Sequence, residues 1–236
     1  MLKLAFCIGF FLTSTLTANT PVELDGKNLL VYFNDGDTFQ IHGTSNSRTS
    51  ARLKGFNALE SYGPVHQWGR WTAKELSDIS SEATLEARQG DWHCRTLGAK
   101  DKYGRILVDC ADLAKDLISK GLAHIMFVNS EDYDADLVQA QQDAIHTKVG
   151  MWKKGVPDYI LTSVHSTAEK SLADSKAYDR FVSILDGHSV IRSHHNAYDT
   201  CEKVAYTPEE GKTASSMFYV PFAERYGANK AECLKN

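Results

Sequence analysis

Apolar and polar residues alternate along residues 29–56, and this period of two indicates strands that bury one face. Asp35 and Gly36 lie between two of the apolar runs, where an Asp-Gly pair is a strong signal for a hairpin. A second alternating pair surrounds the polar turn at residues 100–104. Five strands are predicted, over residues 29–33, 38–43, 51–56, 91–99 and 105–111.

Three segments have helical rather than alternating periodicity. In the first, tryptophans and aliphatic residues recur at helical spacing. The second is expected to stop at Gly121, and the third to run from a cap near Ser130 to Gly150. The predicted helices cover residues 68–87, 112–123 and 130–152.

The order of these elements favours an α+β fold that is mainly β. Three strands, a helix, two strands and two helices suit a five-stranded Greek-key barrel of the OB type with three helices. The pattern weakens after Pro157, where residues 166–185 are compatible with a helix and the rest resembles loops. We therefore expect a C-terminal extension over residues 158–236, called the extension below, whose role the pattern does not define.

The first 18 residues form a separate unit. Lys3 precedes an apolar run, and Thr17 and Ala18 are small, as the end of a signal peptide requires. The run is too short for a comfortable membrane span. We expect a signal peptide over residues 1–18 and a secreted or periplasmic (envelope) chain that has no stable membrane association after cleavage. A buried helix and an uncleaved anchor are the alternatives.

The overall charge argues against a non-specific nucleic-acid binder. The net charge is −4 and the pI is about 6.1, whereas such proteins usually have a strong positive balance. Any contact with nucleic acid must therefore come from a local basic patch. Lys100, Lys102 and Arg105 cluster around Tyr103 on one predicted hairpin, where lysines could meet phosphates and the ring could stack on a base or sugar. A solvated turn is the alternative.

Four cysteines remain once the predicted signal peptide is removed, and an even number in a secreted chain favours disulfides. Cys94 and Cys110 lie on the two strands beside the turn at residues 100–104. They can form a cross-strand disulfide if their Cβ atoms face each other, and two buried thiols are the alternative. Cys201 and Cys233 would then pair by elimination.

Four motifs occur in order along residues 29–153. They are DGDT at 35–38, ARLKGFNALE at 51–60, KDKYGR at 100–105, and GLAHIM followed by a helix ending in GMW at 121–152. Together they resemble the staphylococcal nuclease (thermonuclease) family. The resemblance implies an OB-fold barrel and calcium-dependent hydrolysis of phosphodiester bonds in DNA and RNA. It also assigns Lys102 and Tyr103 to substrate binding.

The resemblance makes Arg52, Glu60 and Arg105 the catalytic residues of an endonuclease. The chemistry requires these residue types. Phosphodiester hydrolysis places extra negative charge on the phosphoryl oxygens, and arginine meets such oxygens in pairs and stays charged. Glu60 falls on the glutamate that orients or deprotonates the attacking water, a role that a carboxylate near the water can perform.

The resemblance assigns calcium to Asp37, assisted by Asn57 and by the backbone carbonyl of Ala58. Calcium is a hard cation that takes oxygen ligands. Two residues depart from the family pattern. Asn57 replaces a second metal aspartate, so it offers an oxygen without a charge, and Leu59 replaces a proline that would stiffen the approach to Glu60.

Each candidate residue also has an ordinary structural explanation. The aspartates could be turn residues, Arg52 an exposed strand arginine and Glu60 a solvated loop carboxylate. The alternative to a nuclease is therefore a catalytically inactive OB-fold module that binds nucleic acid or a protein, and Asn57 and Leu59 favour it. A third possibility is that the extension makes the chain part of a complex, whose protein partners the sequence does not identify. The histidines of the extension lack the spacing of a zinc site.

Overall fold

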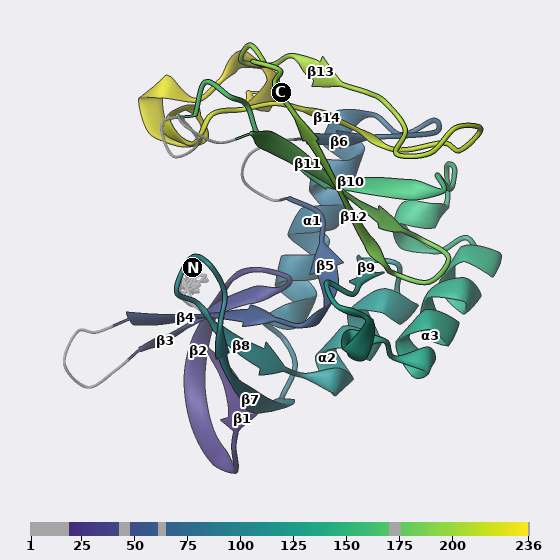
Figure 1. Ribbon diagram of the computed structural model, residues 1–236. Coiled ribbons are helices and arrows are strands. Elements are labelled where there is room, and N and C mark those ends of the chain that lie inside the picture. The colour runs from purple at the N-terminus through teal and green to yellow at the C-terminus, as the bar shows by residue number, and fades with distance from the viewer. Residues whose placement is uncertain (1–18, 43–47, 61–64, 170–175, 236) are drawn as a thin grey trace, which may run out of the picture.

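A computed structural model describes residues 19–42, 48–60, 65–169 and 176–235. Figure 1 shows a β-barrel, three helices beside it, and the extension above them. The barrel strands are β1 (Thr20–Leu24), β2 (Lys27–Asp35), β3 (Thr38–His42), β4 (Arg48–Leu53), β7 (Trp92–Lys100) and β8 (Ile106–Asp109). The helices are α1 (Ala73–Ala87), α2 (Ala111–Ser119) and α3 (Ala135–His146). Two further strands, β5 (Gly55–Ala58) and β9 (Ala123–Met126), pair with each other beside the barrel.

The barrel confirms the expected fold class, an OB-type α+β barrel with three helices, and adds one strand. It closes in the order β1-β2-β3-β4-β8-β7, with β1 parallel to β7 and β4 parallel to β8. The sixth strand, β1, forms a hairpin with β2 through Asp25 and Gly26, whose φ angles are 51° and 76°. Such a turn favours Asp-Gly. The signal that predicts the Asp35 hairpin therefore occurs twice, and its first occurrence marks β1.

Several helix boundaries differ from the predicted ones. Helix α1 begins after Thr72, which forms a capping box with Glu75, so residues 68–71 precede the helix. Helix α3 is capped by Asp134, whose side chain accepts hydrogen bonds from two backbone N–H groups of the first turn. The cap predicted near Ser130 is wrong, because Ser130 begins a separate 3-10 turn, η1 (Ser130–Asp132). Gly150 begins a second one, η2 (Gly150–Trp152), rather than ending α3.

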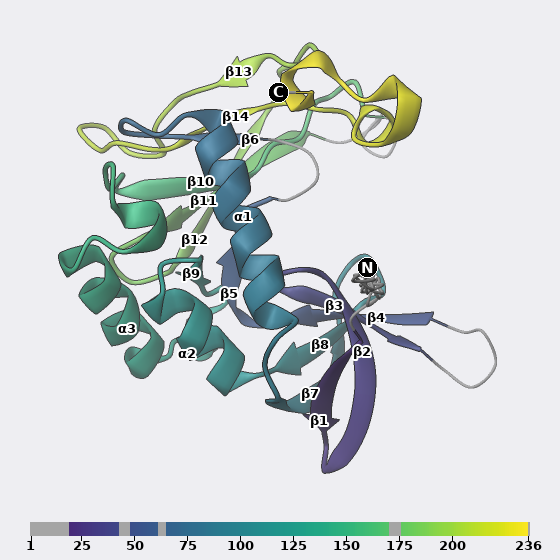
Figure 2. The ribbon, with the colours of Figure 1, turned by 180° about the vertical axis from the view of Figure 1, so that it is seen from behind.

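Large apolar side chains of the barrel and the helices form one continuous core. Helix α1 runs from the barrel up to the extension and lies against both (Figure 2). Its Ala83 and Ala87 are fully buried, and the small Ala83 allows Gly36, in the turn between β2 and β3, to approach the helix closely. Core residues with less than 2% exposure include Phe33, Phe39, Phe56, Leu117 and Trp152.

The extension contributes strands to two small sheets in place of the predicted helix, and the segments expected to be loops, residues 195–200 and 207–213, are loops and turns. One contains β10 (Tyr159–Ser163), β11 (Ala177–Ser183) and β12 (Ser189–His194), and the other β13 (Lys203–Val204), β14 (Ser216–Phe218) and β6 (Val65–Gln67). The helix predicted over residues 166–185 is wrong, because β11 occupies Ala177–Ser183. A second apolar cluster, separate from the main core, fills the extension around Phe181, Met217 and Tyr219.

The extension is joined to the rest of the chain by backbone pairing. Strand β6 lies between β5 and α1 in the sequence but pairs with β14, so Val65 stands opposite Phe218. The backbone N–H of Phe127 also donates to the carbonyl of Gly187 at 2.7 Å. The domain boundaries at residues 29–153 and 158–236 stay predictions. The contacts of β6 with β14 and of Phe127 with Gly187 are where the two parts of the chain meet.

Both expected cysteine pairs are disulfides in the structure. The Cα atoms are 4.3 Å apart in Cys94–Cys110 and 5.8 Å apart in Cys201–Cys233. The predicted signal peptide lies outside the described residues and stays a prediction. Within the described part of the chain, no helix is long and apolar enough to cross a membrane.

Candidate active site

The turn between β2 and β3 buries one carboxylate and uses another to hold the backbone. The backbone N–H of Asp37 donates to Asp35 Oδ1 at 3.1 Å, so Asp35 shapes the turn as predicted for an Asx residue. Asp37 is only 3% exposed. Gly36 permits this burial by its size, because a Cβ atom there would lie 3.0 Å from the Ala58 Cβ and 3.1 Å from the Ala83 Cβ.

Asp37 is fully engaged by neighbouring donors. Its Oδ2 accepts a hydrogen bond of 2.7 Å from the backbone N–H of Ala58. Its Oδ1 accepts from Thr38 Oγ1 at 3.1 Å and forms an ion pair with Arg52. The buried carboxylate therefore draws the turn, β4 and β5 to one point.

Arg52 bridges the two predicted calcium ligands. Besides its pair with Asp37, its Nη2 donates to Asn57 Oδ1 at 2.5 Å. Burial lowers the pKa of Arg52, but the carboxylates of Asp37, Asp35 and Glu60 outweigh burial and raise it. The guanidinium is therefore held in its charged form by three carboxylates.

His124 fixes the orientation of the Asn57 amide, and the sequence did not predict this role. Asn57 Nδ2 donates to the Ala58 carbonyl at 2.7 Å and lies 3.5 Å from His124 Nε2. His124 Nδ1 lies 2.8 Å from the carbonyl of Ile125 and donates to it, which leaves Nε2 as an acceptor. Burial lowers the pKa of His124 to about 4, so the ring is neutral. The amide oxygen of Asn57 consequently faces Arg52.

Glu60 is held at the end of a buried segment. Leu59 is 1% exposed, and its carbonyl accepts a hydrogen bond of 2.6 Å from Ser80 Oγ on α1. Burial and the charge of Asp37 raise the pKa of Glu60 from 4.5 to about 7, although Arg52, Arg225 and Arg105 lower it. Burial and Asp37 also raise the pKa of Asp35 well above its ordinary value. A carboxylate with a pKa near neutrality can accept a proton from water.

Arg105 is positioned by Asp101, which lies inside the KDKYGR motif but had no predicted role. Asp101 Oδ1 accepts from the backbone N–H groups of Tyr103 and Arg105 at 2.9 and 3.0 Å, and Oδ2 accepts from Arg105 Nε at 2.7 Å. Burial raises the pKa of Asp101, but these donors outweigh burial and lower it. Asp101 and Gly104 stand at the first and fourth positions of a four-residue β-turn, where Asp and Gly are the usual residues.

Lys102 and Tyr103 lie at the exposed tip of the loop between β7 and β8. The Lys102 ammonium is 4.9 Å from the Tyr103 ring centroid and 4.7 Å from the ring centroid of Tyr178 on β11, and it also donates to the Tyr178 hydroxyl. The Arg105 guanidinium is 5.5 Å from the Tyr103 ring. The loop thus presents two cations and an aromatic ring, and its contact partner comes from the extension.

The residues assigned to calcium fit a hard cation by their oxygens. Asp37 Oδ1 and Asn57 Oδ1 converge on the same guanidinium, so both point to one position that a cation occupies. Burial first, and the charge of Asp37 second, raise the pKa values of Asp35 and Glu60, and a bound divalent cation would offset the second of these causes. Among the described residues, no group of three His, Cys, Asp or Glu side chains is arranged to hold a metal ion.

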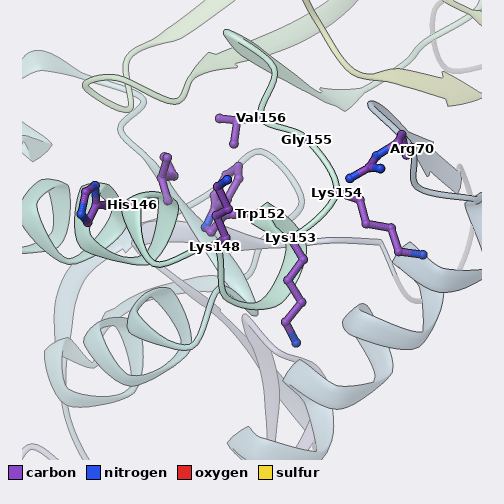
Figure 3. Close-up of a pocket in the computed structure, with 9 residues that line it drawn as sticks. Arg70, His146, Lys148, Trp152, Lys153, Lys154, Gly155 and Val156 are labelled. Atoms are coloured by element: carbon purple, nitrogen blue, oxygen red, sulfur yellow. The ribbon is translucent and has the colours of Figure 1, made fainter.

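A separate pocket of about 510 Å³ contains none of the predicted site residues (Figure 3). It lies between the end of α3, η2 and the turn before α1, and its labelled side chains include Arg70, Lys148 and Lys153. No carboxylate lines this pocket. It therefore lacks the carboxylates that the cluster around Asp37 and Glu60 provides.

Comparison with known proteins supports the resemblance seen in the motifs. Residues 50–154 match the model of the family described as Staphylococcal nuclease homologue. The match includes Arg52, Asn57, Glu60 and Arg105, whereas Asp37 lies before it. No curated protein matches the chain.

Proposed function

Because residues 50–154 form a domain of the staphylococcal nuclease type, we propose that the chain is a calcium-dependent nuclease that hydrolyses phosphodiester bonds in DNA and RNA. One observation carries this proposal. A half-buried arginine, Arg52, and a carboxylate whose pKa is about 7 lie around the same buried aspartate, and the charge of Arg105 also acts on that carboxylate. Phosphodiester hydrolysis requires a cation that stabilises the phosphoryl oxygens and an acceptor for the proton of the attacking water.

In the proposed reaction Glu60 accepts a proton from water while the water oxygen attacks phosphorus. The phosphoryl group gains negative charge as this bond forms, and the guanidinium groups of Arg52 and Arg105 pair with its oxygens. The bond from phosphorus to the leaving sugar oxygen then breaks, and that oxygen takes up a proton from solvent. Arg52 leaves the Asp37 carboxylate to make this contact.

Calcium would be held by Asp37, by Asn57 Oδ1 and by the carbonyl of Ala58. When bound, it supplies positive charge to a phosphate oxygen and to the attacking water. Asn57 contributes no charge, so we expect weaker calcium binding than a site with two aspartates gives. Lys102 and Tyr103 are proposed to contact the nucleotide from the loop between β7 and β8.

We also propose that the chain follows a secretory route to the envelope or the exterior. Two disulfides support this proposal, because such bonds persist in oxidising compartments. The predicted signal peptide is consistent with it.

Cleavage of single-stranded DNA and of RNA by residues 19–236, in calcium and in EDTA, tests the proposed function. We expect strand cleavage in calcium and none in EDTA. Equal cleavage in EDTA would contradict the role of calcium, and no cleavage in calcium would favour the inactive binding module. The ion pair of Arg52 with Asp37 is the observation that favours this second candidate, because it occupies the position assigned to the cation.

A further inference from the structure

The extension touches the substrate-binding loop through Tyr178. Residues Ala177 and Asp179 on β11 are buried in the extension, whereas Tyr178 between them is half-buried and faces the opposite side of the sheet. Its hydroxyl accepts a hydrogen bond from Lys102, and its ring packs against that of His165, with centroids 4.4 Å apart and the ring planes tilted by 44°. Tyr178 is therefore an aromatic side chain that contacts Lys102 at the tip of the loop between β7 and β8.

The extension also brings a cation close to Glu60. Arg225 follows the 3-10 turn η4 (Phe222–Glu224), and its Nε donates to the carbonyl of Val220 at 3.0 Å. The positive charge of Arg225 is one of the influences that lower the pKa of Glu60, against burial and the charge of Asp37, which raise it. The Cys201–Cys233 disulfide closes the segment that carries Arg225, and the N–H of Ala231 donates to the Glu224 carbonyl at 2.8 Å.

Cations interleaved with aromatic rings are typical of sites for single-stranded nucleic acid. The Lys102 ammonium lies between the rings of Tyr103 and Tyr178, which come from the two parts of the chain. An unpaired base can stack on such a ring while the ammonium moves to a phosphate. The bases of a duplex are already stacked and are not available to the ring.

We propose that the extension forms the second wall of the candidate active site and binds single-stranded nucleic acid, with Tyr178 stacking on a base and Arg225 pairing with a phosphate. This inference rests on the proposed function, because it assigns two further residues to the substrate of that reaction. It also explains why the extension is fixed to the rest of the chain by the pairing of β6 with β14.

Binding of a fluorescent oligothymidylate to the full chain tests the role of Tyr178. The measurement uses the Glu60→Gln protein in calcium and a strand of about ten nucleotides, within the length that single-strand sites cover. Tyr178→Ala is expected to weaken binding about 5- to 150-fold, the range for one lost base stack. Tyr178→Phe keeps the ring and is expected to bind within about twofold of the parent. Binding of a duplex of equal length is expected to be unaffected by either variant.

The salt dependence of the same binding reaction tests Arg225. A residue that neutralises one phosphate contributes about 0.7 to the slope of log K against log salt for a single strand. Arg225→Gln is expected to lower the slope by about this amount, a change that a merely structural role does not produce. Lys230→Gln is the matched control, because Lys230 is exposed on the same segment, and it is expected to leave the slope unchanged.

Two results would overturn the inference in different ways. If Tyr178→Ala and Arg225→Gln bind as tightly as the parent, or more tightly, the extension is not part of the substrate site, and the proposed function stands. If the Glu60→Gln parent itself binds no oligonucleotide, the proposed function fails and the inference fails with it.

Discussion

Among the candidate residues, Glu60 has the environment that points most directly to a catalytic role, that of a general base. Its pKa is raised to about 7, and a general base must be ionised to accept a proton. We therefore expect kcat/KM for DNA cleavage to fall as the pH is lowered through the pKa of Glu60. The midpoint is expected at or somewhat below pH 7, because bound calcium adds positive charge near this carboxylate. A pH–rate profile with its midpoint near 4.5, the ordinary value for glutamate, would contradict this assignment.

The same raised pKa has a consequence for stability. A carboxyl whose folded pKa lies above its unfolded value stabilises the fold at low pH, and this contribution is lost as pH rises through about 7. Glu60→Gln should therefore raise the melting temperature of the calcium-free protein at about pH 8 by about 2–4 °C, which corresponds to about 1 kcal/mol. At about pH 4 the two proteins should melt together. Equal melting at both pH values would show that Glu60 has an ordinary pKa.

Asn57 limits the charge of the proposed calcium site. We expect Asn57→Asp to bind calcium about tenfold more tightly in calorimetric titrations, because a carboxylate adds one negative charge to the ligands. The new carboxylate would also face His124 Nε2 and raise the pKa of that imidazole from about 4. Asn28→Asp on the exposed end of β2 is the control. An unchanged affinity in Asn57→Asp would remove Asn57 from the calcium site.

Motifs predicted which residues form the candidate site but not how these residues contact one another. DGDT and ARLKGFNALE placed Asp37 and Arg52 together, and their ion pair follows from strand register, since Thr38 stands opposite Arg52. His124 lay inside the quoted GLAHIM motif, yet its role depends on the pairing of Asn57 with His124 between β5 and β9. A long-range register of this kind leaves no local pattern in the sequence.

At the scale of elements, the Cys94–Cys110 disulfide closes the hairpin that carries Arg105. Its sequence separation is 16 residues, and closure of a loop of that size stabilises a fold by about 3 kcal/mol in the chain-entropy account. We expect the double variant Cys94→Ala, Cys110→Ala to lose about this much free energy of unfolding in urea titrations. An unchanged urea midpoint would mean that the hairpin is held by packing alone.

Strand β11 shows why the extension was difficult to predict. Alternation is present there, with Ala177, Asp179 and Phe181 buried, but one of the inward positions is a charged residue. Asp179 is buried because it accepts hydrogen bonds from the hydroxyls of Tyr198 and Tyr206 at 3.0 and 2.8 Å. A buried aspartate hides the period of two, so the segment resembled a helix.

At the scale of the whole molecule, the extension and the barrel depend on each other. A chain that stops after Pro157 loses the partner of β6 and the contact of Phe127 with Gly187. We expect this truncation to lower the melting temperature by about 5 °C or more, because it exposes apolar core residues and unpaired backbone groups. An unchanged melting temperature would show that residues 29–153 form an independent domain.

The sequence predicted the barrel better than the assembly of the two parts. Most barrel pairs join strands that are neighbours in the sequence, several of them through turns with clear signals, whereas β6 and β14 are three-residue strands separated by about 150 residues. Such short strands have no periodicity to detect. The net charge of −4 was similarly uninformative, because the cations that matter are gathered around one site.

The most direct test of the account is kcat/KM for cleavage of single-stranded DNA in calcium by the wild type, Glu60→Gln and Glu82→Gln. Glu82 is an exposed glutamate of α1 and serves as the matched control. We predict that Glu60→Gln lowers kcat/KM by about 10²- to 10⁴-fold, the usual contribution of a general base, and that Glu82→Gln does not. Equal activity of the wild type and Glu60→Gln would contradict the proposed active site.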